Sequence, residues 1–234
     1  ANPIAGTTRD AIDSTVKIHG KKYLIIDTAG IRRKSKISQT LEKYSVVKAL
    51  KSINRCDIVL VLIDAEEGIT EQDTKITGLA YERGKACLIV VNKWDKIKKD
   101  NATVGKYVEE IKDKLKFLDF APIIFISAVT GQRAPKIFDL IDKVYAQYTQ
   151  RIGTSPLNNL VEQAVRKNPL PRYQNRLMQI YYATQTDIKP PTFVFFVSNS
   201  KGIHFSYERY LMNQIREKFE FDSVPLKLIF RKKS

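Results

Sequence analysis

The sequence has 234 residues, 43% of them hydrophobic, and a formal net charge of +15. A chain of this size can bury a full core, either as one large domain or as a medium and a small one. No apolar run reaches the roughly 18 residues that span a bilayer, and no signal-peptide pattern opens the sequence, so we expect a cytoplasmic protein. The two cysteines, Cys56 and Cys87, lack metal-ligand spacing and adjoin apolar runs, which favours small core residues.

Strand-like and helical patterns alternate over the first 150 residues. We predict a hairpin at 15–26 around Gly20, strands at 58–63, 88–91 and 123–126, and helices at 41–53, 70–83, 104–117 and 135–148. Strands separated by helices imply right-handed crossovers and a mostly parallel sheet that is covered on both faces. The predicted fold class of residues 1–150 is therefore α/β, with a doubly wound sheet.

The pattern changes near residue 150. Gly153-Thr154-Ser155-Pro156 offers a helix N-cap and a proline suited to a first helical turn. After the helix that starts there, we predict strands at 177–183 and 192–197, a helix at 205–219 and a strand at 225–230. The order α-β-β-α-β predicts a small α+β, KH-like domain over residues 154–234.

The most specific motif is Asn92-Lys93-Trp94-Asp95, directly after the apolar run 87–91. Ligands of open α/β sheets bind beyond the carboxyl ends of the strands, so we expect Asp95 to face that crevice. A carboxylate there can accept from the ring N–H and the amino group of guanine, which adenine cannot offer. Asn92 can bridge the base and the backbone, and the stem of Lys93 can lie along the ring. Taken alone, four residues also fit a strand that ends in a polar turn.

Three further motifs give the first one context. Asp27-Thr28-Ala29-Gly30 ends the apolar run 23–26, where Asp27 can hold Mg²⁺ through its water shell and the Gly30 N–H can approach a phosphate. Ser127-Ala128 follows the run 123–126, and its small side chains let backbone N–H groups reach a base carbonyl. Thr8, in Gly6-Thr7-Thr8-Arg9-Asp10, is the candidate hydroxyl ligand of Mg²⁺.

In this order, these motifs resemble the Era-like branch of the translation-factor GTPases. With Lys189-Pro190-Pro191-Thr192-Phe193 and the segments 205–211 and 225–231, the sequence resembles the bacterial family of ribosome-assembly GTPases called Der or EngA. That family carries two G domains in tandem before a KH-like domain. The resemblance implies that residues 1–150 are an N-terminally incomplete, P-loop-type G domain.

The resemblance also implies an activity and its partners. The protein is expected to bind GTP and GDP with Mg²⁺, to hydrolyse GTP, and to act as a monomer on the large (50S) ribosomal subunit and its ribosomal RNA. The implied catalytic residues are Thr8 and Gly30, and the implied metal ligands are Thr8 and Asp27. The implied nucleotide-binding residues are Asp27, Thr28, Ala29, Gly30, Asn92, Lys93, Asp95, Ser127 and Ala128.

The phosphate-cradling loop G-x-x-x-x-G-K-[ST] would precede Gly6 by roughly two dozen residues, so we expect it to lie ahead of residue 1. Residues 78–86 are similar only superficially, because they have one residue too many between the glycines and an alanine in place of the hydroxyl. We interpret them as a helix C-terminus closed by Gly84. Without the loop, we expect these residues alone to bind nucleotide poorly and to be inactive. The alternative function is a non-hydrolysing module that binds RNA or packs domains.

Two departures limit the resemblance. Ile31 follows Gly30 where Ras-type enzymes place the glutamine that orients the attacking water, so we expect slow intrinsic hydrolysis. A potassium ion at the phosphates or the ribosomal partner is then the candidate activator. The KH-like part also lacks the G-x-x-G loop that clamps a nucleic-acid backbone, so ordinary KH binding is not expected.

The net charge is concentrated in the second part, where 14 basic and 6 acidic residues follow Gln150. The excess as a whole favours RNA as a partner, although for any one of these residues a solvated surface is the favoured explanation. The residues 32–36 follow the nucleotide sensor, and they either couple nucleotide state to partner binding or tether a loop to local acids. The basic residues singled out for RNA are Arg166, Lys167, Arg172, Arg176, Arg231, Lys232 and Lys233.

Overall fold

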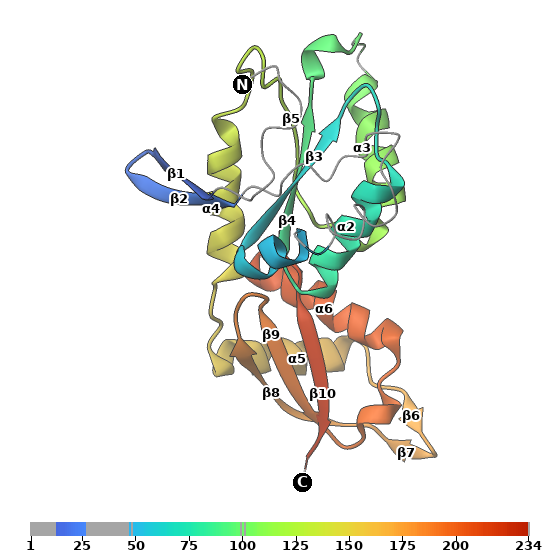
Figure 1. Ribbon diagram of the computed structural model, residues 1–234. Helices are drawn as coiled ribbons and strands as arrows, with labels where there is room; N and C mark the ends of the chain where they lie inside the picture. The colour runs from blue at the N-terminus through green and yellow to red at the C-terminus, as the bar shows by residue number, and fades with distance from the viewer. Residues whose placement is uncertain (1–12, 27–46, 48, 99, 101, 234) are drawn as a thin grey trace. The chain divides into compact units, whose positions relative to one another are not determined.

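The structure, a computed structural model, describes residues 13–26, 47, 49–98, 100 and 102–233 (Figure 1). It separates into two compact units. The first comprises Ala1–Asp119 and Ile123–Ile141, and the second comprises Phe120–Pro122 and Asp142–Ser234. The division falls inside helix α4, Lys136–Tyr148. No helix within the described residues is long and apolar enough to cross a membrane.

The first unit opens with a hairpin of β1, Asp13–Ile18, and β2, Lys21–Ile26. The strands pair antiparallel, and the turn residues His19 and Gly20 both have positive φ, at 48° and 79°. Two consecutive residues with positive φ suit the right-handed twist of a tight hairpin. The hairpin predicted around Gly20 is therefore confirmed.

The sheet of the first unit is parallel, with the order β3-β4-β5. Its strands are β3, Ile58–Asp64, β4, Ala86–Asn92, and β5, Ile123–Phe125. The central strand β4 is buried from Ala86 to Val91 because its neighbours and helices cover it on all sides. Helix α4 packs on one face, where Leu88 and Val90 belong to a cluster with Ile137, Leu140 and Ile141.

Helices α2, Glu71–Glu82, and α3, Thr103–Lys114, lie on the other side of this sheet (Figure 1). A short 3-10 helix, η2, Lys116–Leu118, follows α3. Residues 49–55 are helical, and the rest of the helix predicted at 41–53 lies mostly outside the described residues. The predicted α/β class, with helices on both faces, is confirmed.

Helix α2 ends as its sequence predicts. Gly84 has a φ of 67°, and its N–H donates to the Tyr81 carbonyl at 2.8 Å. The Lys85 N–H donates to the Ala80 carbonyl at 3.0 Å. Both bonds satisfy carbonyls of the last turn, which is the role of a glycine after a helix. Residues 78–86 are therefore a helix end and not a phosphate loop.

The second unit has the predicted order α-β-β-α-β. Its elements are α5, Thr154–Lys167, β8, Ile180–Asp187, β9, Thr192–Val197, η3, Ser200–Gly202, α6, Phe205–Phe219, and β10, Lys227–Lys232. The sheet has the order β10-β9-β8, with β9 antiparallel to β8 and parallel to β10. Phe193, Phe195 and Leu211 are at most 1% exposed and form the centre of its core.

One local prediction for this unit was wrong. The strand predicted at 177–183 is divided, because β7, Arg176–Leu177, pairs instead with β6, Arg172–Tyr173. Gln174 and Asn175 make that turn with φ of 50° and 59°, without the glycine that usually signals it. The start predicted for the following helix is confirmed, because Gly153 is the N-cap of α5 and Pro156 lies in its first turn.

The free edge of β8 is closed by a side chain of α5. Asn158 accepts from the Ala183 N–H at 2.8 Å and donates to the Ala183 carbonyl at 2.8 Å. An unpaired strand edge otherwise offers its backbone groups to other chains. One amide therefore replaces the missing neighbour strand at this position.

Replacing Asn158 by alanine should lower the free energy of unfolding by about 1–3 kcal/mol, since two partly buried backbone groups lose their partner. Urea denaturation measures the loss, and amide exchange at Ala183 should accelerate. Asn159→Ala is the matched control, because Asn159 is exposed on the same helix. Equal stability of the two variants would contradict the bridging role of Asn158.

Candidate functional site

The candidate site lies where the three parallel strands of the first unit end. Asp64 and Asn92 are the last residues of β3 and β4 and lie opposite each other in the sheet. Beyond them, the Ala65 N–H donates to the Asn92 carbonyl at 2.9 Å, and the Ile126 N–H donates to the Val91 carbonyl at 2.8 Å. The chain segments that leave all three strands are thus joined by backbone hydrogen bonds.

Asn92 connects the two predicted base-reading motifs. Its side-chain oxygen accepts the N–H of Ala128 at 3.0 Å, although the two residues are 36 positions apart. The Trp94 N–H also donates to the Ile126 carbonyl at 3.0 Å. The structure therefore brings Asn92 and Ala128 together as direct partners.

Lys93 turns the chain and holds a buried acid. Its φ of 62° lies in the left-handed region, which a non-glycine residue adopts only where its surroundings fix it. Its ammonium forms an ion pair with Asp64, whose side chain is 1% exposed, and lies 3.8 Å from Glu66. Asp64 also accepts the Glu66 N–H at 3.0 Å. The head of Lys93 is thus anchored to β3, which fixes the course of its methylene stem.

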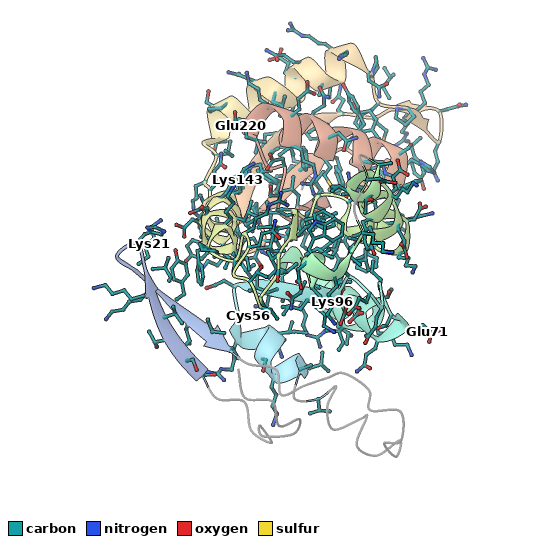
Figure 2. All side chains as sticks on the ribbon, turned by 90° about the horizontal axis from the view of Figure 1, so that it is seen from above. Lys21, Cys56, Glu71, Lys96, Lys143 and Glu220 are labelled. Atoms are coloured by element: carbon teal, nitrogen blue, oxygen red, sulfur yellow. The ribbon has the colours of Figure 1, made fainter. Side chains whose placement is uncertain are left out.

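The Lys93 ion pair extends to a second lysine. The Lys96 ammonium lies 2.9 Å from Glu66, and the hydrogen bond to that carboxylate raises the pKa of Lys96. Lys96 is labelled in Figure 2 and locates this ion-pair network there. Sequence reasoning missed Asp64 and Glu66. The signal was present for Asp64, which ends an apolar run as Asp27 and Asn92 do.

Trp94 anchors the segment 92–95 in the core of the first unit. It is 3% exposed, with its ring 4.4 Å from Phe125 and 5.1 Å from Tyr107. The Tyr107 hydroxyl donates to the Ala65 carbonyl at 2.8 Å. With Trp94 held in the core, the next residue of the 3-10 helix η1, Trp94–Lys96, is directed outward, and Asp95 is exposed.

Ser127 and Ala128 belong to a tight turn after β5. Ser127 is fully buried, its hydroxyl accepts the Thr130 N–H at 3.2 Å, and its own N–H donates to the Gln132 carbonyl at 3.1 Å. Gly131 completes the turn with a φ of 74°. Ser127 therefore shapes the turn, whereas Ala128 is exposed at its surface.

The predicted phosphate and metal residues lie outside the described residues. They are Thr8, Asp27, Thr28, Ala29 and Gly30. Residues 32–36 also lie outside. Among the described residues, no group of His, Cys, Asp and Glu side chains is arranged to hold a metal ion. Burial raises the pKa of the Cys87 thiol to about 12 and also raises that of Cys56, as fits two unreactive packing residues.

The buried acid makes Lys93 testable. Lys93→Met should lower the free energy of unfolding by about 1–3 kcal/mol, because Asp64 then keeps a buried charge without its ion pair. Adding Asp64→Asn should recover much of this loss. Chemical denaturation can be followed through Trp94, the only tryptophan of the sequence.

Lys96→Met is the matched control for this measurement. Lys96 pairs with Glu66, and both side chains are about half exposed, so its loss should cost under about 1 kcal/mol. If the two lysine variants are equally stable, the ion pair with Asp64 does not stabilise the turn.

Two family models match this chain. Residues 151–231 match the "KH-domain-like of EngA bacterial GTPase enzymes, C-terminal" model, and residues 1–93 match the "50S ribosome-binding GTPase" model. GTPase Der of Geobacter metallireducens is 55% identical over 231 residues, which are 99% of this chain and 53% of that protein. GTPase Der of a Thermoanaerobacter species is 51% identical over 98% of this chain and 52% of its own length. The chain thus spans about half the length of these relatives.

Solved structures agree on the fold. A crystal structure of Era in complex with MgGDPNP and nucleotides 1506–1542 of 16S ribosomal RNA superposes with a TM-score of 0.52 at 22% identity. It covers 100% of this chain and 84% of the other. A single-residue variant of Aquifex aeolicus Era bound to GDP.AlF4- gives the same TM-score, identity and coverage. The arrangement of a GTPase-like α/β domain followed by a KH-like domain is therefore shared with Era.

Proposed function

The chain belongs to the GTPase Der (EngA) family, matching its C-terminal G domain and KH-like domain, and from this membership we propose a GTP-binding and GTP-hydrolysing switch in large-subunit assembly. The observation that carries the proposal is the Asn92–Ala128 hydrogen bond, which joins the N-K-W-D and S-A motifs at one end of the sheet. Residues 1–150 are the part of the G domain present here, and residues 154–234 are the KH-like domain.

Guanine is read at the exposed carboxylate of Asp95. The carboxylate accepts from the ring N–H and the amino group of the base, and a seated base removes it from water, so a base without these donors leaves a desolvated charge. Asn92 uses its oxygen on Ala128, so its NH₂ end remains to donate to the base. The carbonyl of the base shares the Ala128 N–H with Asn92. Lys93 lies along the ring with its ammonium held by Asp64.

The phosphate end is assigned from the sequence. Oxygen ligands from an aspartate and a threonine suit Mg²⁺, so Asp27 and Thr8 would hold the metal, which would neutralise charge on the phosphates. Thr28, Ala29 and Gly30 sense whether the γ-phosphate is present. Since Ile31 cannot orient water, a potassium ion or the ribosome completes the catalytic site.

The proposed partner is the 50S subunit with its ribosomal RNA, in the cytoplasm. The KH-like domain has a higher net positive charge per residue than the G domain, which supports an RNA partner. Nucleotide state would control the arrangement of the domains and thereby this binding.

Asp95→Asn should exchange base preference in the protein extended to the length of its relatives. An asparagine donates and accepts, which fits xanthine, with its carbonyl at carbon 2, and not guanine. We expect affinity for GTP to fall by at least about 100-fold and affinity for xanthosine triphosphate to rise, while ATP binds neither form. Titration of fluorescent nucleotides measures all three.

Asp113→Asn is the matched control, because Asp113 is an exposed acid of the same unit whose nearest ion-pair partner is 4.0 Å away. It should leave nucleotide binding unchanged. If the extended protein accepts ATP as readily as GTP, the assignment of Asp95 fails. If it binds no nucleotide, the non-hydrolysing module becomes the better description.

Hydrolysis should depend on the monovalent cation. The extended protein should turn over GTP slowly in sodium and at least several-fold faster in potassium or with 50S subunits, because its own side chains do not position the water. Phosphate release in matched sodium and potassium buffers is the measurement. Fast turnover in sodium without ribosomes would contradict this prediction.

A further inference from the structure

A β-bulge in β8 changes which side chains the KH-like sheet presents. Pairing passes from Ile180 opposite Val197 to Tyr182 opposite Phe196, so Tyr181 is an extra residue in the strand. A bulge of this kind redirects the side chains around it. Tyr181 and Tyr182 are 47% and 40% exposed, which is unusual for two adjacent aromatic residues of a strand.

The tyrosines share one face of the sheet with a phenylalanine. The rings of Tyr182 and Phe196 are stacked, with centroids 4.4 Å apart and planes 17° apart. The preceding residue of β9, Phe195, stacks on Phe230 and is fully buried. Since neighbouring residues of a strand point to opposite faces, Phe196 and Tyr182 lie on the face opposite this core pair. We call Tyr181, Tyr182 and Phe196 the aromatic platform.

Cations from the end of β10 border the aromatic platform. Arg231 lies opposite Phe196 in the sheet, and the Lys233 ammonium lies 4.8 Å from the centre of the Tyr181 ring. The Lys233 N–H donates to the Val197 carbonyl at 3.0 Å, which continues the strand pairing. Arg231 and Lys233 are two positions apart in this extended segment, so their side chains lie on the same face of the sheet. Both are exposed.

We propose that the aromatic platform binds unpaired bases of RNA by stacking, with Arg231 and Lys233 contacting the flanking phosphates. This inference rests on the proposed ribosomal function and adds the binding mode. Aromatic side chains next to cations are the combination that single-stranded nucleic acid requires, because bases stack on rings while phosphates pair with charge. Tyr182 is partly exposed and already stacks on Phe196, so a base that stacks on Tyr182 would extend this pair.

The positive charge around the aromatic platform favours RNA as its ligand over an apolar protein surface. Arg231, Lys232 and Lys233 are consecutive and exposed, and the part of the chain after Gln150 has 14 basic and 6 acidic residues. Duplex RNA has its bases paired and stacked internally, so it can use the cations and not the rings. The proposed ligand is therefore a single-stranded loop, bulge or end.

The test compares how single-stranded and double-stranded RNA bind to the full chain and to a variant without the two tyrosine rings. Tyr181→Leu/Tyr182→Leu keeps apolar volume and removes both rings, and should weaken binding of a mixed-sequence single-stranded RNA by roughly 5- to 150-fold per lost stack. Binding of the same RNA annealed to its complement should not change. The salt dependence should also stay the same, because no charge is lost. Fluorescence anisotropy over a salt series measures each quantity.

Tyr145→Leu is the matched control. Tyr145 is also 40% exposed in the second unit and also lies under a lysine, with the Lys189 ammonium 4.6 Å from its ring centre, but it belongs to α4. It should leave RNA binding unchanged. Arg231→Gln/Lys233→Gln should weaken both RNA forms and lower the salt slope by roughly 0.7 per cation on single strands. Thermal unfolding confirms that each variant is folded.

Each outcome has a distinct meaning when binding to 50S subunits is measured in parallel. Equal single-stranded RNA binding by the parent and the tyrosine variant overturns the stacking inference and leaves the ribosomal proposal intact. A variant that loses 50S binding but keeps RNA binding overturns it in favour of a protein partner. A parent that binds 50S subunits but no RNA oligonucleotide also overturns it. A parent that binds neither refutes the ribosomal partner itself.

Discussion

The candidate site depends on how backbone groups find partners where parallel strands end. Beyond the last paired residue of a strand, each backbone N–H and C=O needs a new hydrogen-bond partner, from the protein or from water. Here the segments that follow β3, β4 and β5 supply one another, through bonds such as Ala65 to Asn92 and Trp94 to Ile126. These hydrogen bonds join the three segments to one another. The proposed recognition of guanine needs such a fixed site, because hydrogen bonds discriminate between bases only if donors and acceptors do not shift to suit the wrong base.

The N-K-W-D segment combines residues that pack with one that we propose to recognise guanine. Lys93 adopts a left-handed backbone conformation and is held by a buried carboxylate, and Trp94 fills the core beside Phe125. Asp95 follows directly and is exposed. Asp95 thus owes its position to the Lys93–Asp64 ion pair and to the packing of Trp94. A variant of Trp94 or Asp64 would therefore change nucleotide affinity indirectly.

Burial explains how much of this architecture could be predicted from the sequence. Strands such as β4 are continuous apolar runs, so the carboxyl ends of β3, β4 and β5 were predicted to within one residue. Asn92 is the last residue of β4, where the prediction had placed it directly after the strand. The Lys93–Asp64 pair was missed because it depends on the register of β3 against β4, which no local pattern encodes. The β6–β7 hairpin was missed because Gln174 and Asn175 adopt positive φ without a glycine. The bulge at Tyr181 was missed because an extra residue leaves the composition of a strand unchanged.

The KH-like domain illustrates why a fold does not determine a binding mode. It has the expected order of elements but no G-x-x-G loop, so its backbone has no dedicated clamp for nucleic acid. Positive charge alone would bind duplex and single strands with little distinction, because phosphates are common to both. Exposed rings add the missing selectivity, since only unpaired bases offer free faces. A single inserted residue in β8, beside an edge already closed by Asn158, is a small structural change that supplies such rings without disturbing the core.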